Sequence, residues 1–296
     1  MGKIYHRISA PIALFFLLFP LCAQGASLGK CYKRTTEGIE ISYLGGYPSA
    51  KRIHSKVQGA DPASFLLLAD IQGDNCGQAP LYGADAKQVF FRNKPLAGAD
   101  PKYFIVIGKG YSHDRIGLYY RDKLVANVKP EGIRLIPIPY STAVYCATTA
   151  VVLSRDEPII AAVDPLTVQA LGGRWLRDAK HVYLEHFKEN IQGADPNSFS
   201  VLAPRKGRLR DLLYAQDRNR VYMLTAQGVK ILQGADPATF ERLNKQYCRD
   251  RSTVYYQGMP VEGAHAPSFH VPKRTFGHTG FDKFGKIHRG KRVAGK

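Results

Sequence analysis

Residues 191–199 read Ile-Gln-Gly-Ala-Asp-Pro-Asn-Ser-Phe. Nearly the same motif, starting with its Gly, recurs at Gly59, Gly98 and Gly234. We call this block the joint. Its Asp suits the cap of a short helical turn, its Pro suits the first position of that turn, and its Phe can anchor it. The sequence therefore predicts one helical turn at each joint of a repeated scaffold.

A second block combines an aromatic residue, an Asp three residues later and a β-rich triplet that begins four residues after the Asp. Five copies keep this spacing: Tyr82, Asp85 and Val89–Phe91; Tyr111, Asp114 and Leu118–Tyr120; Trp175, Asp178 and Val182–Leu184; Tyr214, Asp217 and Val221–Met223; Tyr247, Asp250 and Val254–Tyr256. Two weaker copies start at Tyr43 and Tyr145, the second with Thr148 in place of Asp. Seven repeats therefore cover residues 43–270, and this repetition determines the architecture.

One repeat can be interpreted in chain order. The Asp suits a tight turn in which its carboxylate accepts from backbone amides ahead. The triplet predicts a strand, and Gln257-Gly258 after the last triplet predicts a hairpin turn. A short third strand then leads to the joint. We predict a mainly β fold of tandem short antiparallel strands, each repeat with one helical turn, in a solenoid-like array or, alternatively, a closed ring.

Connections between repeats alternate between long and short. The longer ones include Leu67–Leu81 and Val201–Leu213. Because insertions are tolerated in loops, variable function is expected on these connections.

The N-terminus is typical of a secretory signal. Lys3 and Arg7 precede an apolar run, Ile8–Leu21, which is followed by small residues. The run is too short for an ordinary membrane span, so we expect cleavage before Ala26 and export of the mature chain. The sequence does not distinguish the periplasm from the cell surface or the medium. An N-terminal segment, 26–42, would then precede the repeats.

The mature chain is strongly basic and keeps an even number of cysteines. Loss of two basic residues leaves 40 Lys and Arg against 24 Asp and Glu, a formal charge of +16. Four cysteines in an oxidising compartment allow three pairings. Cys31 and Cys76 flank the first repeat and are the preferred pair. Cys146 and Cys248 lie three repeats apart, so an open array would separate them and only a closed ring would join them.

Residues 271–296 predict a basic, disordered tail, because few apolar residues are present. Phe281-Asp282-Lys283 offers an alternative, the remnant of an eighth repeat. Clustered cations attract polyanions by releasing counterions. The predicted anion-binding residues are Lys273, Arg274, Lys283, Lys286, Arg289, Lys291 and Arg292.

The two blocks together resemble the DKNYY repeat family of exported bacterial proteins. The nearest matches are the run from Asp250 to Tyr256 and the run from Gly193 to Phe199, and the resemblance spans about 43–270. No copy has an intact Asp-Lys-Asn, and the last joint reads Gly-Ala-His-Ala-Pro from Gly263. The resemblance implies an exported repeat protein and carries no catalytic residue across.

The remaining Asp, His and aromatic residues that could bind a metal or a ligand are expected to have structural roles. The joint Asp residues are expected to cap turns, because calcium needs six to eight oxygens around one point. His181 and His186 lie on a strand and turn without the spacing of a helical zinc motif. The aromatic triplets fit either burial on both faces or one exposed aromatic ladder. We expect no catalytic, cofactor or metal residues.

The sequence therefore favours an exported, non-enzymatic binding or scaffold module of the bacterial envelope or the exterior. Its expected partner is an anionic envelope component, such as lipopolysaccharide or an acidic glycan, or another envelope protein. The alternative is a secreted hydrolase of an anionic polymer, with catalytic groups on the long connections.

Overall fold

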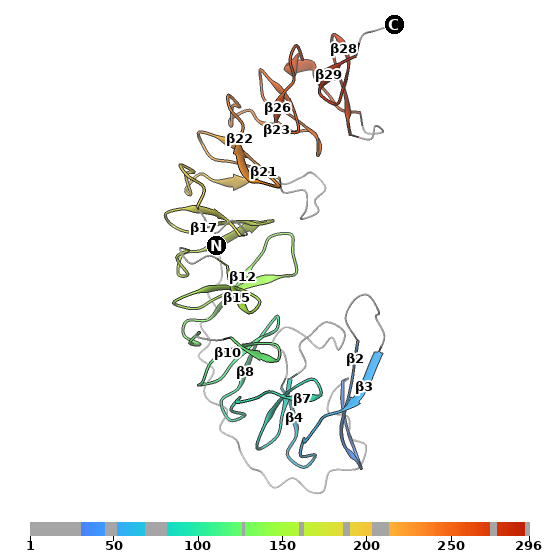
Figure 1. Ribbon diagram of the computed structural model, residues 1–296, viewed down its shortest axis with the longest axis vertical. Helices are drawn as coiled ribbons and strands as arrows, with labels where there is room; N and C mark the ends of the chain where they lie inside the picture. Colours follow the sequence, from blue (N-terminus) through green and yellow to red (C-terminus); the bar gives the residue numbers. More distant parts are fainter. Residues whose placement is uncertain are drawn as a thin grey trace. The chain divides into compact units, whose positions relative to one another are not determined.

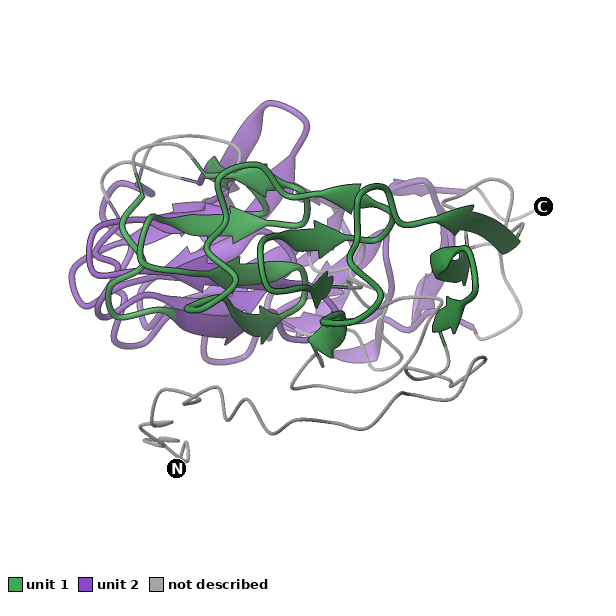
Figure 2. Ribbon diagram, turned by 90° about the horizontal axis from the view of Figure 1, so that it is seen from below, with its two compact units in different colours: residues 1–133, 155–157 green, residues 134–154, 158–296 purple. Residues whose placement is uncertain are grey.

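The computed structural model describes residues 31–44, 52–68, 82–125, 128–159, 163–185, 190–202, 213–272 and 277–293. These residues form eight small antiparallel sheets that follow one another along the chain (Figure 1). The predicted mainly β fold of tandem units is therefore confirmed. The chain divides into two compact units, residues 1–133 with 155–157 and residues 134–154 with 158–296 (Figure 2).

Each sheet consists of strands that are consecutive in the chain. The first three sheets contain β1 (Tyr32–Thr35), β2 (Gly38–Leu44) and β3 (Arg52–Lys56); β4 (Leu66–Leu68), β5 (Tyr82–Ala84), β6 (Val89–Phe91) and β7 (Lys94–Pro95); β8 (Ile105–Gly108), β9 (Tyr111–His113), β10 (Leu118–Tyr120) and β11 (Lys123–Leu124). The next three contain β12 (Arg134–Pro137), β13 (Val144–Ala147), β14 (Val152–Ser154) and β15 (Glu157–Pro158); β16 (Gln169–Gly172), β17 (Trp175–Arg177) and β18 (Val182–Leu184); β19 (Ser200–Val201), β20 (Tyr214–Gln216), β21 (Val221–Thr225) and β22 (Gly228–Ile231). The last two contain β23 (Glu241–Arg242), β24 (Tyr247–Arg249), β25 (Val254–Tyr256) and β26 (Met259–Pro260); β27 (Thr279–Asp282), β28 (Gly285–His288) and β29 (Lys291–Arg292).

The triplet strands are buried on both faces. Val89, Phe90 and Phe91 of β6 are all buried. Phe90 packs in one cluster with Tyr32 of the preceding sheet, whereas Val89 and Phe91 pack in another with Tyr119 of the following sheet. Successive strand residues point to opposite faces, so each sheet contributes to two neighbouring cores. The exposed aromatic ladder is therefore wrong for these triplets, and the two-sided alternative is confirmed.

The joint Phe fills the space between consecutive sheets. The ring of Phe65 lies 5.3 Å from that of Tyr32 and 5.8 Å from that of Phe90. The ring of Phe240 makes the same pair of contacts in the second unit, at 5.9 Å from both Tyr214 and Tyr255. Tilted aromatic contacts at these distances add to the gain from burial. The joint therefore anchors one sheet to the next, as its sequence predicts.

The joint backbone is simpler than the predicted helical turn. Residues Ala266–Ser268 form a short 3₁₀ helix, and Phe269 after it is already extended, with φ −71° and ψ 132°. At Asp100 and Asp236 the joint is a turn closed by one backbone bond, which runs from the Thr239 N–H to the Asp236 carbonyl at 3.2 Å in the second case. The chain returns to an extended path at the Phe to reach the core, so the turn ends there. No α-helix occurs among the residues that the structure describes.

The first repeat begins at Tyr32, not at the predicted Tyr43. Tyr32 is buried, and Thr35, three residues later, takes the place of the turn Asp. The Thr35 hydroxyl oxygen accepts from the Glu37 N–H at 3.3 Å and donates to the Gly38 carbonyl at 3.1 Å. The predicted N-terminal segment 26–42 is thus part of a repeat from residue 32 onward. Residues 1–30, including the predicted signal, lie outside the described part.

The predicted tail forms a sheet instead of a disordered segment over residues 277–293. Ile287 of β28 is fully buried in a cluster with Phe269 and Val261 of the preceding repeat. The backbone of His270 also exchanges hydrogen bonds with that of Phe281, at 2.8 and 2.9 Å. The alternative prediction, the remnant of an eighth repeat around Phe281-Asp282-Lys283, agrees with this sheet. The sequence prediction underestimated how much burial of a single Ile stabilises this segment. The gain is large because the preceding repeat covers the side chain.

The outer faces of the first and the last sheet are polar. In the first sheet Ile39 and Ile41 are buried, so Glu40 points to the opposite face beside its cross-strand partner Lys33. In the last sheet Ile287 is buried, and its neighbours Lys286 and His288 are exposed, with the half-buried Phe281 opposite Lys286 on the same face. Polar outer faces are typical of capping repeats. Among the described residues no sheet is closed and none runs on from one repeat to the next, so neither a closed nor a solenoid sheet is found.

Candidate anion-binding site

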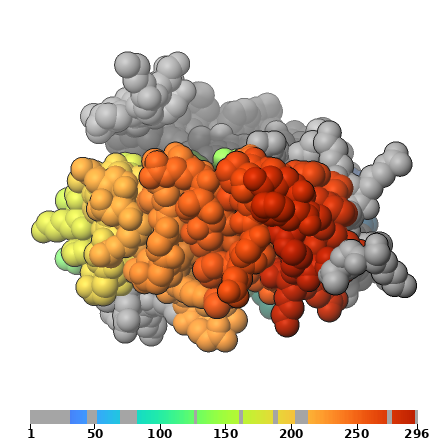
Figure 3. Space-filling view, turned by 90° about the horizontal axis from the view of Figure 1, so that it is seen from above, coloured from blue at the N-terminus to red at the C-terminus, as the bar shows by residue number. Residues whose placement is uncertain are grey.

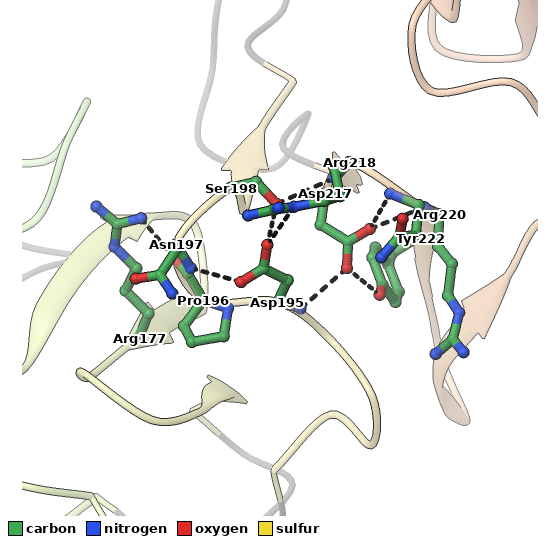
Figure 4. Close-up of polar contacts among 10 residues, drawn as sticks. Arg177, Asp195, Pro196, Asn197, Ser198, Asp217, Arg218, Arg220 and Tyr222 are labelled. Carbon is green, nitrogen blue, oxygen red and sulfur yellow. Dashed lines mark hydrogen bonds and ion pairs between the residues drawn. The ribbon is translucent and has the colours of Figure 1, made fainter.

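Figure 4 shows how the joint Asp and the turn Asp are connected. The Asp217 carboxylate accepts from the backbone N–H of Asp195 at 3.0 Å and from the Tyr222 hydroxyl at 2.6 Å. Its other oxygen accepts from the N–H groups of Asn219 and Arg220, both at 2.8 Å. This carboxylate is therefore fully occupied by the scaffold. It performs the predicted turn-closing role and also ties together two repeats.

The joint carboxylate is occupied as well. Asp195 accepts from the Asn197 N–H at 3.1 Å, from the Ser198 hydroxyl at 2.6 Å and from the Arg218 guanidinium at 2.8 Å (Figure 4). On the other side of the joint, Arg177 donates to the carbonyl of Pro196 at 2.7 Å. The hydrogen bond from Ser198, with those from Asn197 and Arg218, lowers the pKa of Asp195.

The same arrangement recurs, and it is structural. The Asp236 N–H donates to Asp250 at 3.1 Å, and the Asp164 N–H donates to Asp178 at 3.0 Å. Burial opposes ionisation of Asp178 and Asp250, but backbone and tyrosine donors outweigh it and lower the pKa of both. Across the described ranges no group of three or more His, Cys, Asp or Glu is placed to hold a metal ion. The carboxylates act as caps.

The last joint departs from this pattern, because His265 replaces the joint Asp. The His265 N–H still donates to the turn residue Asp282, at 2.8 Å. The Arg292 guanidinium grips both oxygens of Asp282, at 3.0 and 2.7 Å, and its hydrogen bonds hold the pKa of this buried carboxyl far below its usual range. Arg292 therefore belongs to the scaffold, although the sequence pointed to it as an anion-binding residue.

Loss of the joint acid changes the charge around the last turn. In two earlier repeats the residue after the turn Asp pairs with the joint Asp: Arg218 with Asp195 at 2.8 Å, and Arg251 with Asp236 at 3.2 Å. Lys283 occupies the same position in the last repeat and faces a joint that has no carboxylate. Its charge is left uncompensated.

Three further cations lie exposed on the same sheet. We call Lys283, Lys286, Arg289 and Lys291 the terminal basic surface. None of the four makes a salt bridge within the part of the chain that the structure describes. The last sheet, coloured red in Figure 3, lies at the surface beside the orange repeat that precedes it. An anion can therefore reach these cations without breaking an existing pair.

The structure thus brings together four of the seven predicted anion-binding residues as exposed cations that form no salt bridge with a described residue, and it assigns Arg292 to an ion pair. Lys273 and Arg274 lie outside the described residues. Sequence reasoning missed two further features, the exposed ring of Phe284 and the charge effect of His265. The signal for His265 is the irregular last joint, in which a His stands where other joints have Asp.

The other candidate residues have structural explanations or lie outside the described ranges. Cys146 and Cys248 are free and fully buried, and burial raises the pKa of each thiol to about 12. Cys31 is disulfide-bonded. Its pairing with Cys76 stays a prediction, because Cys76 lies in the undescribed segment 69–81. The ring of His181 contacts the Tyr183 hydroxyl at 3.3 Å, and His186 is not described.

Comparisons with known proteins identify no relative: no protein-family model, no curated protein and no solved structure matches this chain. The resemblance to the DKNYY repeat family therefore stays a prediction. Within the described ranges no helix is long and apolar enough to cross a membrane.

Proposed function

We propose that the chain is an exported binding module whose terminal basic surface contacts an anionic component of the bacterial envelope. One observation carries the proposal: Lys283, Lys286, Arg289 and Lys291 are exposed on a single sheet and make no salt bridge with any described residue. Two earlier repeats neutralise the equivalent cation with a joint Asp. Unpaired, clustered cations favour anions over neutral partners, and the gain comes largely from counterion release.

The repeat scaffold supports a binding role. The joint and turn carboxylates, which are chemically the most versatile groups, are committed to holding neighbouring sheets together. Export is proposed from the signal-like residues 1–25. The hydrolase alternative depends on connections whose central segments, 69–81 and 203–212, are not described, and no observation favours it.

The experiment measures binding of the mature chain, residues 26–296, to lipopolysaccharide and to dextran sulfate over a series of salt concentrations. The test variant carries Gln at Lys283, Lys286, Arg289 and Lys291. We expect weaker binding and a salt slope reduced by about one per cation removed that contacts the anion.

A matched control variant carries Gln at four exposed lysines elsewhere, Lys87, Lys94, Lys180 and Lys245. It loses the same formal charge, so it separates a local site from net charge. Equal loss of binding in both variants would contradict the proposed site. Deletion of residues 270–296 is not a suitable test, because it would remove Ile287 and expose the core around Phe269.

A further inference from the structure

The most unusual residue on the last sheet is an exposed aromatic. Phe284 is 63% exposed. It is the second residue of the two-residue turn between β27 and β28, where Asp282 pairs with Gly285. Its ring meets the His265 ring edge-on at 5.9 Å between centroids. A large apolar side chain here gains little from burial within the chain.

The scaffold does not require an apolar residue at this position. The second residue after the turn Asp is Asn219 in the sixth sheet and Ser252 in the seventh, and it is Lys87 and Lys180 in two others. These turns close with the same carboxylate-to-amide bonds as the last one, where the Phe284 N–H donates to Asp282 at 2.9 Å. Ile116 of the third sheet, 62% exposed, is the other large apolar residue at this position. Closure of the turn therefore does not account for the aromatic ring of Phe284.

The ring is also surrounded by cations. The Lys283 ammonium lies over it at 4.8 Å from the centroid, and the Arg292 guanidinium at 5.7 Å. Sugars and nucleic-acid bases are recognised by stacking on a free aromatic face. A ring whose face is engaged by cations is poorly suited to stacking, but much of the side chain remains exposed to solvent.

An anionic lipid surface fits this arrangement. Aromatic side chains favour the boundary between headgroups and acyl chains, and flanking lysines add attraction to anionic headgroups. We propose that the terminal basic surface binds an anionic lipid membrane, with Phe284 entering the headgroup region between Lys283 and Lys286. This inference rests on the proposed function and specifies its partner.

The experiment measures binding of residues 26–296 to vesicles of phosphatidylcholine alone and of phosphatidylcholine mixed with phosphatidylglycerol. Phe284→Ser should lower the affinity for the anionic vesicles about ten-fold, because the ring no longer leaves water. Binding to dextran sulfate, a soluble polyanion, should stay unchanged.

Ile116→Ser is the matched control. Ile116 occupies the same turn position in the third sheet and is 62% exposed. There the joint retains Asp100, whose N–H donates to Asp114 at 2.8 Å. Removal of this apolar residue should leave vesicle binding unchanged. An equal loss in both variants would show that exposed apolar area in general drives binding, and would overturn the inference.

Phe284→Trp gives a direct readout of insertion. The natural Trp175 is buried, so a second indole at position 284 would be the exposed one. Its emission should shift to the blue on anionic vesicles and be quenched by lipids with brominated acyl chains.

The outcomes separate the two proposals. Absence of quenching, or an equal loss of dextran sulfate binding in Phe284→Ser, would overturn lipid insertion and leave an anion-binding surface. If the four-Gln variant binds all anions as tightly as the natural chain, the proposed function itself fails.

Discussion

The backbone N–H of Asp195 donates to the side chain of Asp217 at 3.0 Å, although 22 residues separate them. The two residues belong to different repeats, and the length of the connection between them varies along the chain. For Asp236 and Asp250 the separation is 14 residues and the bond is 3.1 Å. The bond is therefore a property of the interface between repeats and does not depend on the loop.

This relationship predicts a large effect at the turn carboxylate. Asp217→Ala should lower the free energy of unfolding by roughly 3 kcal/mol, because several buried donors lose their acceptor. Tyr222→Phe removes only one donor and should cost about 1 kcal/mol. Phe90 and Ile287 occupy the equivalent position in other repeats, so a side chain without the hydroxyl is tolerated there. Urea unfolding followed by circular dichroism measures both. Similar losses of unfolding free energy in the two variants would contradict the role of Asp217 as the shared acceptor of several hydrogen bonds.

Acid should weaken the array. The folded-state pKa of Asp178, Asp217 and Asp250 is lowered, because hydrogen bonds outweigh the opposing effect of burial. Their stabilising contribution is complete above the unfolded pKa, about 3.9, and is lost as the pH falls through the lower folded values. The urea midpoint should therefore be steady between about pH 5 and 7 and fall below about pH 4.

Asp217→Thr tests the origin of this pH dependence. Thr148 already serves as a non-titrating turn residue, and its hydroxyl accepts from the Ala150 and Val151 N–H groups at 3.2 Å. The variant should be less stable at neutral pH and lose less stability on acidification. Unchanged acid sensitivity would assign the effect to other carboxylates.

The contact between Gly83 and Phe65 should not tolerate a methyl group. A Cβ on Gly83 would lie 2.2 Å from the Cζ of Phe65. Gly83→Ala should therefore cost roughly 1–3 kcal/mol by overpacking. Phe65→Leu in the same chain should recover part of the loss, since the ring carbon that clashes is gone. Thermal unfolding of both single variants and the double variant measures this coupling, and strictly additive losses would count against it.

The two buried thiols should be inert in the folded protein. With a pKa of about 12, Cys146 and Cys248 are ionised in roughly one molecule in ten thousand at pH 8. A thiol reagent should label neither residue in native buffer and both in denaturant. Peptide mapping identifies the labelled sites, and rapid native labelling of either would show that its repeat opens.

The repeat and its strands could be predicted from the sequence because spacing encodes them locally. The Asp turn, the β triplet and the anchoring Phe each reflect a short-range preference or a fixed offset. The structure confirms these features, including the packing of Phe65 between two sheets.

Features that depend on contacts between neighbouring repeats could not be predicted from the sequence. Tyr32 was missed because Thr35 replaces the Asp that marks other repeats. The last sheet was only the alternative to a disordered tail, because Ile287 gains its burial from Phe269 in the repeat before it. The pairing of Arg292 with Asp282 likewise needs two strands to be placed side by side. Such partners are distant in the sequence, so a charge that is paired in the folded protein looks unpaired when only the sequence is considered.

The polar faces of the first and last sheets also constrain how such a gene can lengthen. An internal duplication would place the new repeat between two existing repeats. Both of its faces would then pack against the apolar face of a neighbour. A unit added beyond the last sheet would instead meet the exposed side chains of Lys286 and His288, with Phe281 as the apolar residue beside them. Growth by recombination should therefore favour interior copies, while the terminal units diverge under separate selection.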